Sequence, residues 1–214
     1  MYAKMKLTKH KEPFPHVIIE DLYDDDEEKL IWDEINFLSY RHKMGNAKET
    51  GSAFDDRSGT YLKQNYGIHL DELYPNRDFS NILFATKKIW DPELLEEISS
   101  TDYSFWNYRR VNTKHTLLSY YENTNQYKPH RDSSQFTGLT WFYKEPKQFE
   151  GGDMCFPEYD HNITIKNNMC MIFHSFVQHQ VTKVKMEAQK RNKYGKFTGL
   201  GRYSISQFMT VNYQ

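Results

Sequence analysis

The sequence predicts a mainly β fold with flanking helices, built around a double-stranded β-helix, or jelly roll. Helical spacing dominates up to about residue 100, and short apolar and aromatic runs separated by turn residues follow it. The 16 Tyr and 14 Phe residues among 214 suit the faces of sheets and a lined pocket. We expect a single domain over 1–214, with a mostly helical support region at 1–103 that includes an N-terminal strand, and a jelly-roll catalytic core at 104–214.

Three segments of the first half carry helix signals. Residues 24–38 begin with acidic side chains, which favour a helix N-terminus, and then place apolar side chains on one face, at Ile31, Ile35 and Leu38. Residues 78–90 repeat this apolar spacing. A third helix is predicted over 91–100, with Asp91 as its cap and Pro92 at its first position. The polar, Gly-rich segment 43–60 is predicted to be a mobile loop.

The second half is predicted to form short strands. Their expected positions are 104–111, 115–121, 138–143, 153–156, 162–166, 169–174, 179–184 and 202–211. The stretch "ITIKNNMCMIF" predicts a hairpin, because Asn167 and Asn168 tolerate the positive φ angles of a two-residue primed turn.

The bulk composition excludes several classes of protein. A net charge of −1 gives no global field that attracts nucleic acid or anionic membranes, so nucleic acid is a disfavoured partner. No run of 18 apolar residues is present, and the first 15 residues lack the apolar centre of a secretory signal. Cys155 and Cys170 lie in apolar runs, which predicts two reduced, buried thiols and a cytoplasmic location.

The stretch "YKPHRDSS" places His130 and Asp132 two positions apart. If it forms a strand, both side chains point to the same face and can hold one cation. Two His and one carboxylate on one side of a metal leave three positions open, which suits non-haem Fe(II) oxygenases. A second His some way downstream is therefore required, and His174 and His179 both qualify.

The same His-x-Asp pattern occurs at His69 and Asp71, with His115 downstream, so the motif alone identifies nothing. The pair at 69 has no strand before it, and an ordinary structural role is expected. The pair at 130 follows an aromatic strand and turn. Of its two candidate partners, His179 opens a strand and is favoured as the ligand, whereas a turn or supporting role is expected for His174.

Taken together, these stretches resemble the iron- and 2-oxoglutarate-dependent dioxygenases, most closely the prolyl 4-hydroxylase-like branch. The resemblance is carried in order by "LLSYYENTNQYKPHRD", "LTWFYKE", "FEGGDMCFPEY", "FHSFVQHQVTKV" and "GRYSISQF", over about residues 115–211. The N-terminal "FPHVIIEDLYDDDE" is similar, more loosely, to the opening strand and helix of the family.

The resemblance implies a role for each matching residue. His130, Asp132 and His179 would be the metal ligands, with no catalytic residue beyond the metal centre. Arg202, with Ser204 on the same strand face, would bind the far carboxylate of 2-oxoglutarate. Tyr121 would line the co-substrate pocket, and Tyr127 would lie nearer the metal, on the substrate side.

Two departures from the family pattern bear on these roles. The turn before Tyr127 lacks the usual glycine, and the span from His179 to Arg202 is longer than usual. Arg191, in the inserted polar segment, is therefore an alternative anchor for 2-oxoglutarate. The loops 43–60 and 185–200 are candidates for gating the site.

The resemblance further implies Fe(II), with 2-oxoglutarate and O2 as co-substrates, and ascorbate is a candidate accessory reductant. Oxidative decarboxylation to succinate and CO2 would drive hydroxylation of a C–H bond, with a prolyl residue of a peptide or protein as the favoured substrate. Two alternatives stay open. One is hydroxylation of a free amino acid or other small molecule, and the other is a non-catalytic jelly-roll binding module.

Overall fold

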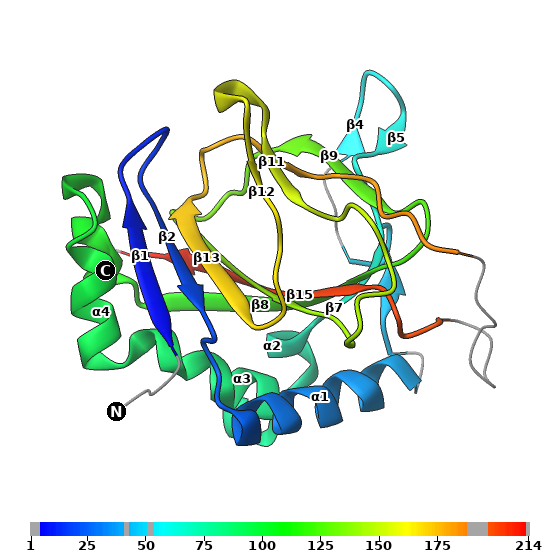
Figure 1. Cartoon of the computed structure of the whole chain (residues 1–214), viewed down its shortest axis with the longest axis horizontal. Coiled ribbons are helices and arrows are strands. Elements are labelled where there is room, and N and C mark those ends of the chain that lie inside the picture. Colours follow the sequence, from blue (N-terminus) through cyan, green and yellow to red (C-terminus); the bar gives the residue numbers. More distant parts are fainter. Residues whose placement is uncertain (1–4, 41–42, 51–53, 188–196, 213–214) are drawn as a thin grey trace.

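The computed structural model describes residues 5–40, 43–50, 54–187 and 197–212, which form two main antiparallel β-sheets flanked by helices (Figure 1). The larger sheet has eight strands, in the spatial order β1 (Lys6–His10), β2 (His16–Glu20), β13 (Met169–His174), β10 (Phe136–Phe142), β15 (Arg202–Thr210), β8 (Thr113–Tyr121), β7 (Tyr66–His69) and β3 (Gly45–Asn46). The smaller sheet runs β12 (His161–Ile163), β11 (Met154–Phe156), β14 (His179–Val181), β9 (Gln126–His130) and β6 (Lys63–Gln64).

The helices lie along the face of the larger sheet that points away from the smaller one (Figure 1). They are α1 (Asp25–Tyr40), α2 (Leu70–Leu73), α3 (Asn81–Ala85) and α4 (Pro92–Ser99), with short 3-10 helices η1 (Arg77–Phe79), η2 (Thr86–Trp90) and η3 (Tyr103–Arg110). A further 3-10 helix, η4 (Pro157–Tyr159), connects β11 and β12 of the smaller sheet. This is the predicted jelly-roll architecture with helices packed outside.

Strand β13 shows how alternation builds two separate cores. Cys170 and Ile172 face the helices, where they join a cluster that includes Ile31 and Ile35 of α1. Met171, on the opposite face of the strand, packs between the two sheets with residues of β10 and β11. Both faces are buried, so the strand is a continuous apolar run instead of an alternating one.

The helix predictions are confirmed in type, with one break. Helix α1 begins one residue after the predicted 24–38 and ends two residues beyond it. Helix α4 begins at Pro92, with the Asp91 side chain accepting a hydrogen bond from the Glu93 amide at 3.1 Å. The predicted helix at 78–90 is divided into η1, α3 and η2. The Ser80 hydroxyl caps α3 by accepting from the Leu83 amide at 3.0 Å, so the helix begins later than predicted.

The predicted strand at 104–111 is wrong, because this segment forms the 3-10 helix η3. The Asp102 side chain accepts a hydrogen bond from the Ser104 amide at 3.0 Å and so starts the helix. Phe105 and Tyr108, three residues apart, are fully buried, while Trp106 is half exposed. The aromatic content favoured a strand, but the burial period is three, as a 3-10 helix requires.

The predicted hairpin around Asn167 and Asn168 is also wrong. Strand β12 pairs with β11 in the smaller sheet, whereas β13 pairs with β10 and β2 in the larger one, so the turn passes the chain between sheets. Of the two residues, only Asn168 has a positive φ, of 55°. Its buried side chain bonds both backbone groups of Tyr23, at 2.9 and 2.7 Å. The conformation of Asn168 is thus fixed by its contact with Tyr23, just before α1, and the local sequence of the turn gives no sign of this contact.

The segment 43–60 is not a continuous loop. It contains β3 and the two strands of a small hairpin, β4 (Phe54–Asp55) and β5 (Thr60–Tyr61), while residues 51–53 lie outside the described residues. Both cysteines are unpaired, as predicted, but only Cys170 is fully buried. Among the described helices, none is long and apolar enough to cross a membrane.

Gly151 occupies a position that no other residue fits. Its φ is +68°, and a Cβ placed on it would lie 2.2 Å from the carbonyl oxygen of Lys183. We expect Gly151→Ala to lower the free energy of unfolding by more than about 3 kcal/mol, measured by urea denaturation. Gly59 is the matched control, because its φ is +64° but its Cβ would meet nothing within 4 Å. Its alanine variant should lose only about 1–2 kcal/mol, and equal losses would show that the carbonyl contact contributes nothing.

His16 on β2 should make stability depend on pH. Burial of the ring lowers its pKa to about 4, and the neighbouring His10 and His161 act in the same direction. In the unfolded chain His16 takes up a proton near pH 6.5, whereas in the folded protein it does so only near pH 4. The unfolded state therefore binds more protons between these values, so the free energy of unfolding falls as the pH decreases through this range.

This dependence is checked by urea denaturation at pH 7 and pH 5. We expect His16→Phe to lose less stability than the wild type between the two conditions. Part of the loss should persist, because burial also lowers the pKa of His130 and of His174. A variant with the full wild-type loss would contradict the assignment to His16.

Candidate metal centre and adjoining cavity

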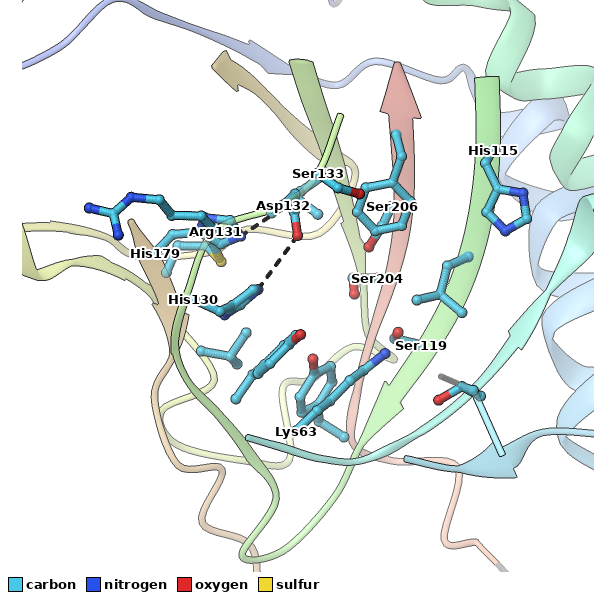
Figure 2. Close-up of a pocket in the computed structure, with 18 of the residues that line it drawn as sticks. Lys63, His115, Ser119, His130, Arg131, Asp132, Ser133, His179, Ser204 and Ser206 are labelled. Atoms are coloured by element: carbon cyan, nitrogen blue, oxygen red, sulfur yellow. Dashed lines mark ion pairs between the residues drawn. The ribbon is translucent and has the colours of Figure 1, made fainter. Parts of the chain in front are cut away.

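His130, Asp132 and His179 converge on one point, and their possible ligand atoms lie within 4.8 Å of one another. His130 ends β9 and His179 begins β14, and the two residues are direct partners across the sheet. An Asp132 oxygen lies 3.7 Å from Nε2 of His130, and its other oxygen lies 3.4 Å from Nε2 of His179 (Figure 2). The structure thus assembles the predicted group, with His179 rather than His174 as its second imidazole.

Asp132 reaches this point by a route that differs from the predicted one. Strand β9 ends at His130, so the pair does not lie on one regular strand face. The Asp132 amide instead donates to the carbonyl of Ser175 at 3.1 Å. The carboxylate accepts a hydrogen bond from the Thr137 hydroxyl at 2.7 Å, and the Thr137 hydroxyl is in turn 2.8 Å from that of Ser175. These contacts fix the direction of the carboxylate.

Both imidazoles are oriented by backbone carbonyls. Nδ1 of His130 lies 2.9 Å from the oxygen of Lys128, and Nδ1 of His179 lies 2.9 Å from the oxygen of Val177. A carbonyl can only accept, so each Nδ1 carries the proton and, in the neutral ring, each Nε2 presents a lone pair to the centre. Burial, together with the nearby His179, lowers the pKa of His130 to about 4, which keeps that ring neutral near pH 7.

The centre is therefore made of acceptors. Two imidazole lone pairs and a carboxylate face one another, and burial of such a set is unfavourable without a cation or a donor among them. Metal-binding His residues commonly donate their other ring N–H to a backbone carbonyl, as both do here. The donor set of two imidazoles and one carboxylate fits a divalent transition metal such as Fe(II).

Tyr127 lies against the centre, as predicted. Its ring stacks on that of His130, with centroids 3.4 Å apart and an interplanar angle of 11°. The stacking shields one face of the imidazole from water and restricts its rotation.

Arg202 lies at the start of β15 and is 1% exposed. Its guanidinium carbon is 4.8 Å from the centre of the Tyr121 ring, and Nη1 lies 3.5 Å from the Ser204 hydroxyl. Burial lowers its pKa to about 10, so it remains a cation at neutral pH. Within the described residues it has no ion pair, and its Nε has no hydrogen-bond partner. A buried guanidinium in this state suits an incoming carboxylate.

One cavity of about 340 Å³ connects these groups. All six predicted site residues line it, together with Lys63, Leu139, Met154 and the serines Ser119 and Ser206 (Figure 2). Burial also raises the pKa of Tyr121 to about 12, so its hydroxyl stays protonated as a donor.

The competing candidates lie elsewhere or have other partners. His174 packs among aromatic rings, 4.9 Å from Phe105 and 4.7 Å from Phe136 between centroids, and is not part of the group at Asp132. Arg191, the alternative anchor, lies outside the described residues, as does most of the segment 185–200, one of the two candidate gating loops.

The second His-x-Asp pair separates in the structure. Asp71 forms an ion pair with Arg77 and accepts from the Thr116 amide at 2.6 Å, which is the structural role predicted for it. Nδ1 of His69 instead lies 2.6 Å from Nε2 of His115. Together with Glu72 these two residues form a second group that could hold a metal. These rings are already bonded to each other, and Glu72 is exposed, unlike the buried group at Asp132.

Three residues of the site were not predicted from the sequence. Thr137, whose hydroxyl bonds to Asp132, lies in β10 but one residue before the predicted strand 138–143, and its contact with Asp132 has no signal in the sequence. Ser206 follows the pattern of alternate residues on β15 after Arg202 and Ser204, so strand periodicity could have found it. Lys63 lies in the polar stretch "YLKQNYG", and no local signal marks it as buried.

Comparison with known proteins agrees with this geometry. Residues 116–209 match the family model of the 2OG-Fe(II) oxygenase superfamily, and this span contains all six predicted site residues. The fold and the matched region resemble those of the Fe(II)- and 2-oxoglutarate-dependent oxygenases. Residues 116–209 are thus similar to the 2OG-Fe(II) oxygenase superfamily, as the motifs predicted, and this family uses Fe(II) and 2-oxoglutarate.

Solved structures share the fold at low sequence identity. A prolyl-4-hydroxylase of Pseudomonas putida matches with a TM-score of 0.61 and 11% identity, over 99% of this chain and 96% of that one. An oxidoreductase of the 2OG-Fe(II) oxygenase family from Burkholderia pseudomallei matches with a TM-score of 0.57 and 11% identity, over 92% of this chain and 85% of that one.

The viral collagen prolyl hydroxylase of Paramecium bursaria Chlorella virus 1, solved with 2-oxoglutarate, gives a TM-score of 0.51 and 12% identity, over 91% and 94% of the two chains. No curated protein matches the sequence.

Proposed function

We propose that this chain is a dioxygenase that hydroxylates a C–H bond of a prolyl residue in a peptide or protein, with His130, Asp132 and His179 holding Fe(II). The observation that supports it best is the convergence of two imidazole lone pairs and a carboxylate, with no donor between the imidazoles, beside a buried arginine that has no ion pair among the described residues.

In this proposal Arg202 binds the far carboxylate of 2-oxoglutarate, with Ser204 and Tyr121 beside it as hydroxyl donors. The near end of 2-oxoglutarate would then face the metal ligands across the cavity. When bound, Fe(II) and 2-oxoglutarate together supply the oxidising power for hydroxylation. The protein's own part is to orient the ligands through Lys128, Val177 and Thr137 and to exclude water by burial.

The peptide substrate is supported by structural likeness to two prolyl hydroxylases with TM-scores above 0.5. The direct experiment is mass spectrometry of proline-containing peptides after incubation with the protein, Fe(II), 2-oxoglutarate and O2. The proposal predicts the gain of one oxygen atom on proline, which requires both Fe(II) and 2-oxoglutarate.

Free L-proline, tested in parallel, covers the small-molecule alternative. Gain of oxygen on the free amino acid alone would replace the peptide proposal. If Fe(II) fails to bind at all, the chain is a binding module that merely shares the fold.

A further inference from the structure

Lys63 is a buried cation inside the site cavity, and it belongs neither to the proposed metal ligands nor to the residues proposed to bind 2-oxoglutarate. It lies on β6, the edge strand of the smaller sheet, and is 4% exposed, whereas the next residue, Gln64, faces solvent. Lys63 pairs in register with Tyr127, and its amine lies 5.8 Å from the centre of that ring. Figure 2 shows the side chain crossing the cavity toward Ser119.

Within the described residues, no hydrogen bond or ion pair reaches the Lys63 amine. Lysine is almost never buried without a partner, because loss of hydration penalises the ammonium group. Burial lowers the pKa of Lys63 to about 8, while the charge of Asp132 opposes this shift. The amine is thus still mostly protonated at pH 7 and faces open space in the cavity.

If the site holds Fe(II) and 2-oxoglutarate, as in the function proposed above, the charges of the metal, its ligands and 2-oxoglutarate leave Lys63 without a negative partner. The two positive charges of the metal offset Asp132 and one carboxylate of 2-oxoglutarate, and Arg202 offsets the other carboxylate. The remaining cation that lines the cavity, Arg131, is half exposed and pairs with Glu158. Among the described residues that line the cavity, Lys63 is then the one buried positive charge left over.

We propose that Lys63 binds a carboxylate carried by the substrate and so selects acidic substrates for this site. It comes from the smaller sheet, beside the ring that stacks on His130, whereas Arg202 comes from the larger sheet beside Tyr121. A carboxylate held by Lys63 would therefore fix the substrate near the metal without competing for the arginine.

The test uses acetate as the minimal carboxylate probe. The protein is loaded with Mn(II) and saturating 2-oxoglutarate, and the paramagnetic relaxation of acetate protons is measured by NMR as acetate is titrated. We expect Lys63→Met to weaken acetate binding roughly tenfold or more, since an ammonium–carboxylate bond is lost. Lys63→Arg should restore most of it. The Met variant should remain folded, because it removes a buried charge without a protein partner.

Lys29→Met, on the exposed face of α1, removes the same charge far from the cavity and should leave acetate binding unchanged. Equal acetate relaxation in Lys63→Met and wild type would overturn the proposal. A tenfold loss of 2-oxoglutarate affinity in Lys63→Met would also overturn it, because Lys63 would then serve the co-substrate. If Mn(II) binds no variant, the proposed function fails instead, so the two failures are distinguishable.

The carboxylate can belong to a peptide side chain or to a free amino acid, and matched pairs separate these sources. One pair is acetyl-Ala-Pro-Asp-amide and its Asn counterpart, and the other is L-proline and L-prolinamide. Each member is tested for displacement of acetate from wild-type protein. Displacement by the charged member of one pair identifies the source, and equal displacement by charged and neutral members would contradict selection by charge.

Discussion

Asp132→Asn is expected to weaken binding of Fe(II) or Mn(II) by more than about 100-fold and to abolish conversion of 2-oxoglutarate to succinate. The amide keeps the shape of the side chain but removes the only negative charge in the group formed with His130 and His179. Anaerobic isothermal titration calorimetry measures the metal affinity, and NMR of the reaction mixture measures succinate.

The chain provides its own matched control in the second His group. His115→Ala removes an imidazole that lines the same cavity and bonds to His69 instead of Asp132. Affinity at the Asp132 group should be unchanged in this variant. If His115→Ala weakened the metal affinity as much as Asp132→Asn, the metal would have been assigned to the wrong group.

Arg202→Met is expected to raise the Kd for 2-oxoglutarate by more than about 100-fold, because truncating one partner of a buried charge pair costs several kcal/mol. The metal affinity should stay within about threefold of wild type, because Arg202 touches Tyr121 and Ser204 but no proposed metal ligand. Calorimetric titration of 2-oxoglutarate into Mn(II)-loaded protein gives the comparison.

Two further variants sharpen this prediction. Arg202→Lys keeps the charge but loses the planar pair of donors, so its affinity should be intermediate. The Met variant should be at least as stable to urea as wild type, since the guanidinium is buried without an ion pair among the described residues. Unchanged 2-oxoglutarate affinity in Arg202→Met would remove Arg202 from the proposed co-substrate site.

The metal ligands and the arginine of the site could be predicted from the sequence because their motifs follow one another in a recognisable order. His179 and Arg202 begin strands that were predicted, β14 and β15, whereas the strand that ends at His130, β9, was not predicted and only its motif marked it. Their spacing then brings them to one cavity through sheet pairing, and His179 stands directly opposite His130. Helix α4 was predictable for a similar reason, because its cap and its proline act locally.

The remainder depends on contacts between distant segments. Asn168 looked like a hairpin residue, but its partner is Tyr23, far away in the sequence. Residues 104–111 have the composition of a strand, and only burial of Phe105 and Tyr108 together makes them a 3-10 helix. Lys63 is polar in a polar stretch, and it is buried only because β6 pairs with β9.

The decisive experiment for the metal centre is a crystal structure with Mn(II) and 2-oxoglutarate, in which anomalous scattering locates the metal. We expect one strong peak at about 2.0–2.2 Å from Nε2 of His130, Nε2 of His179 and an oxygen of Asp132. The far carboxylate of 2-oxoglutarate should contact Arg202. A peak between His69 and His115 with none at Asp132, or 2-oxoglutarate bound away from Arg202, would contradict this assignment.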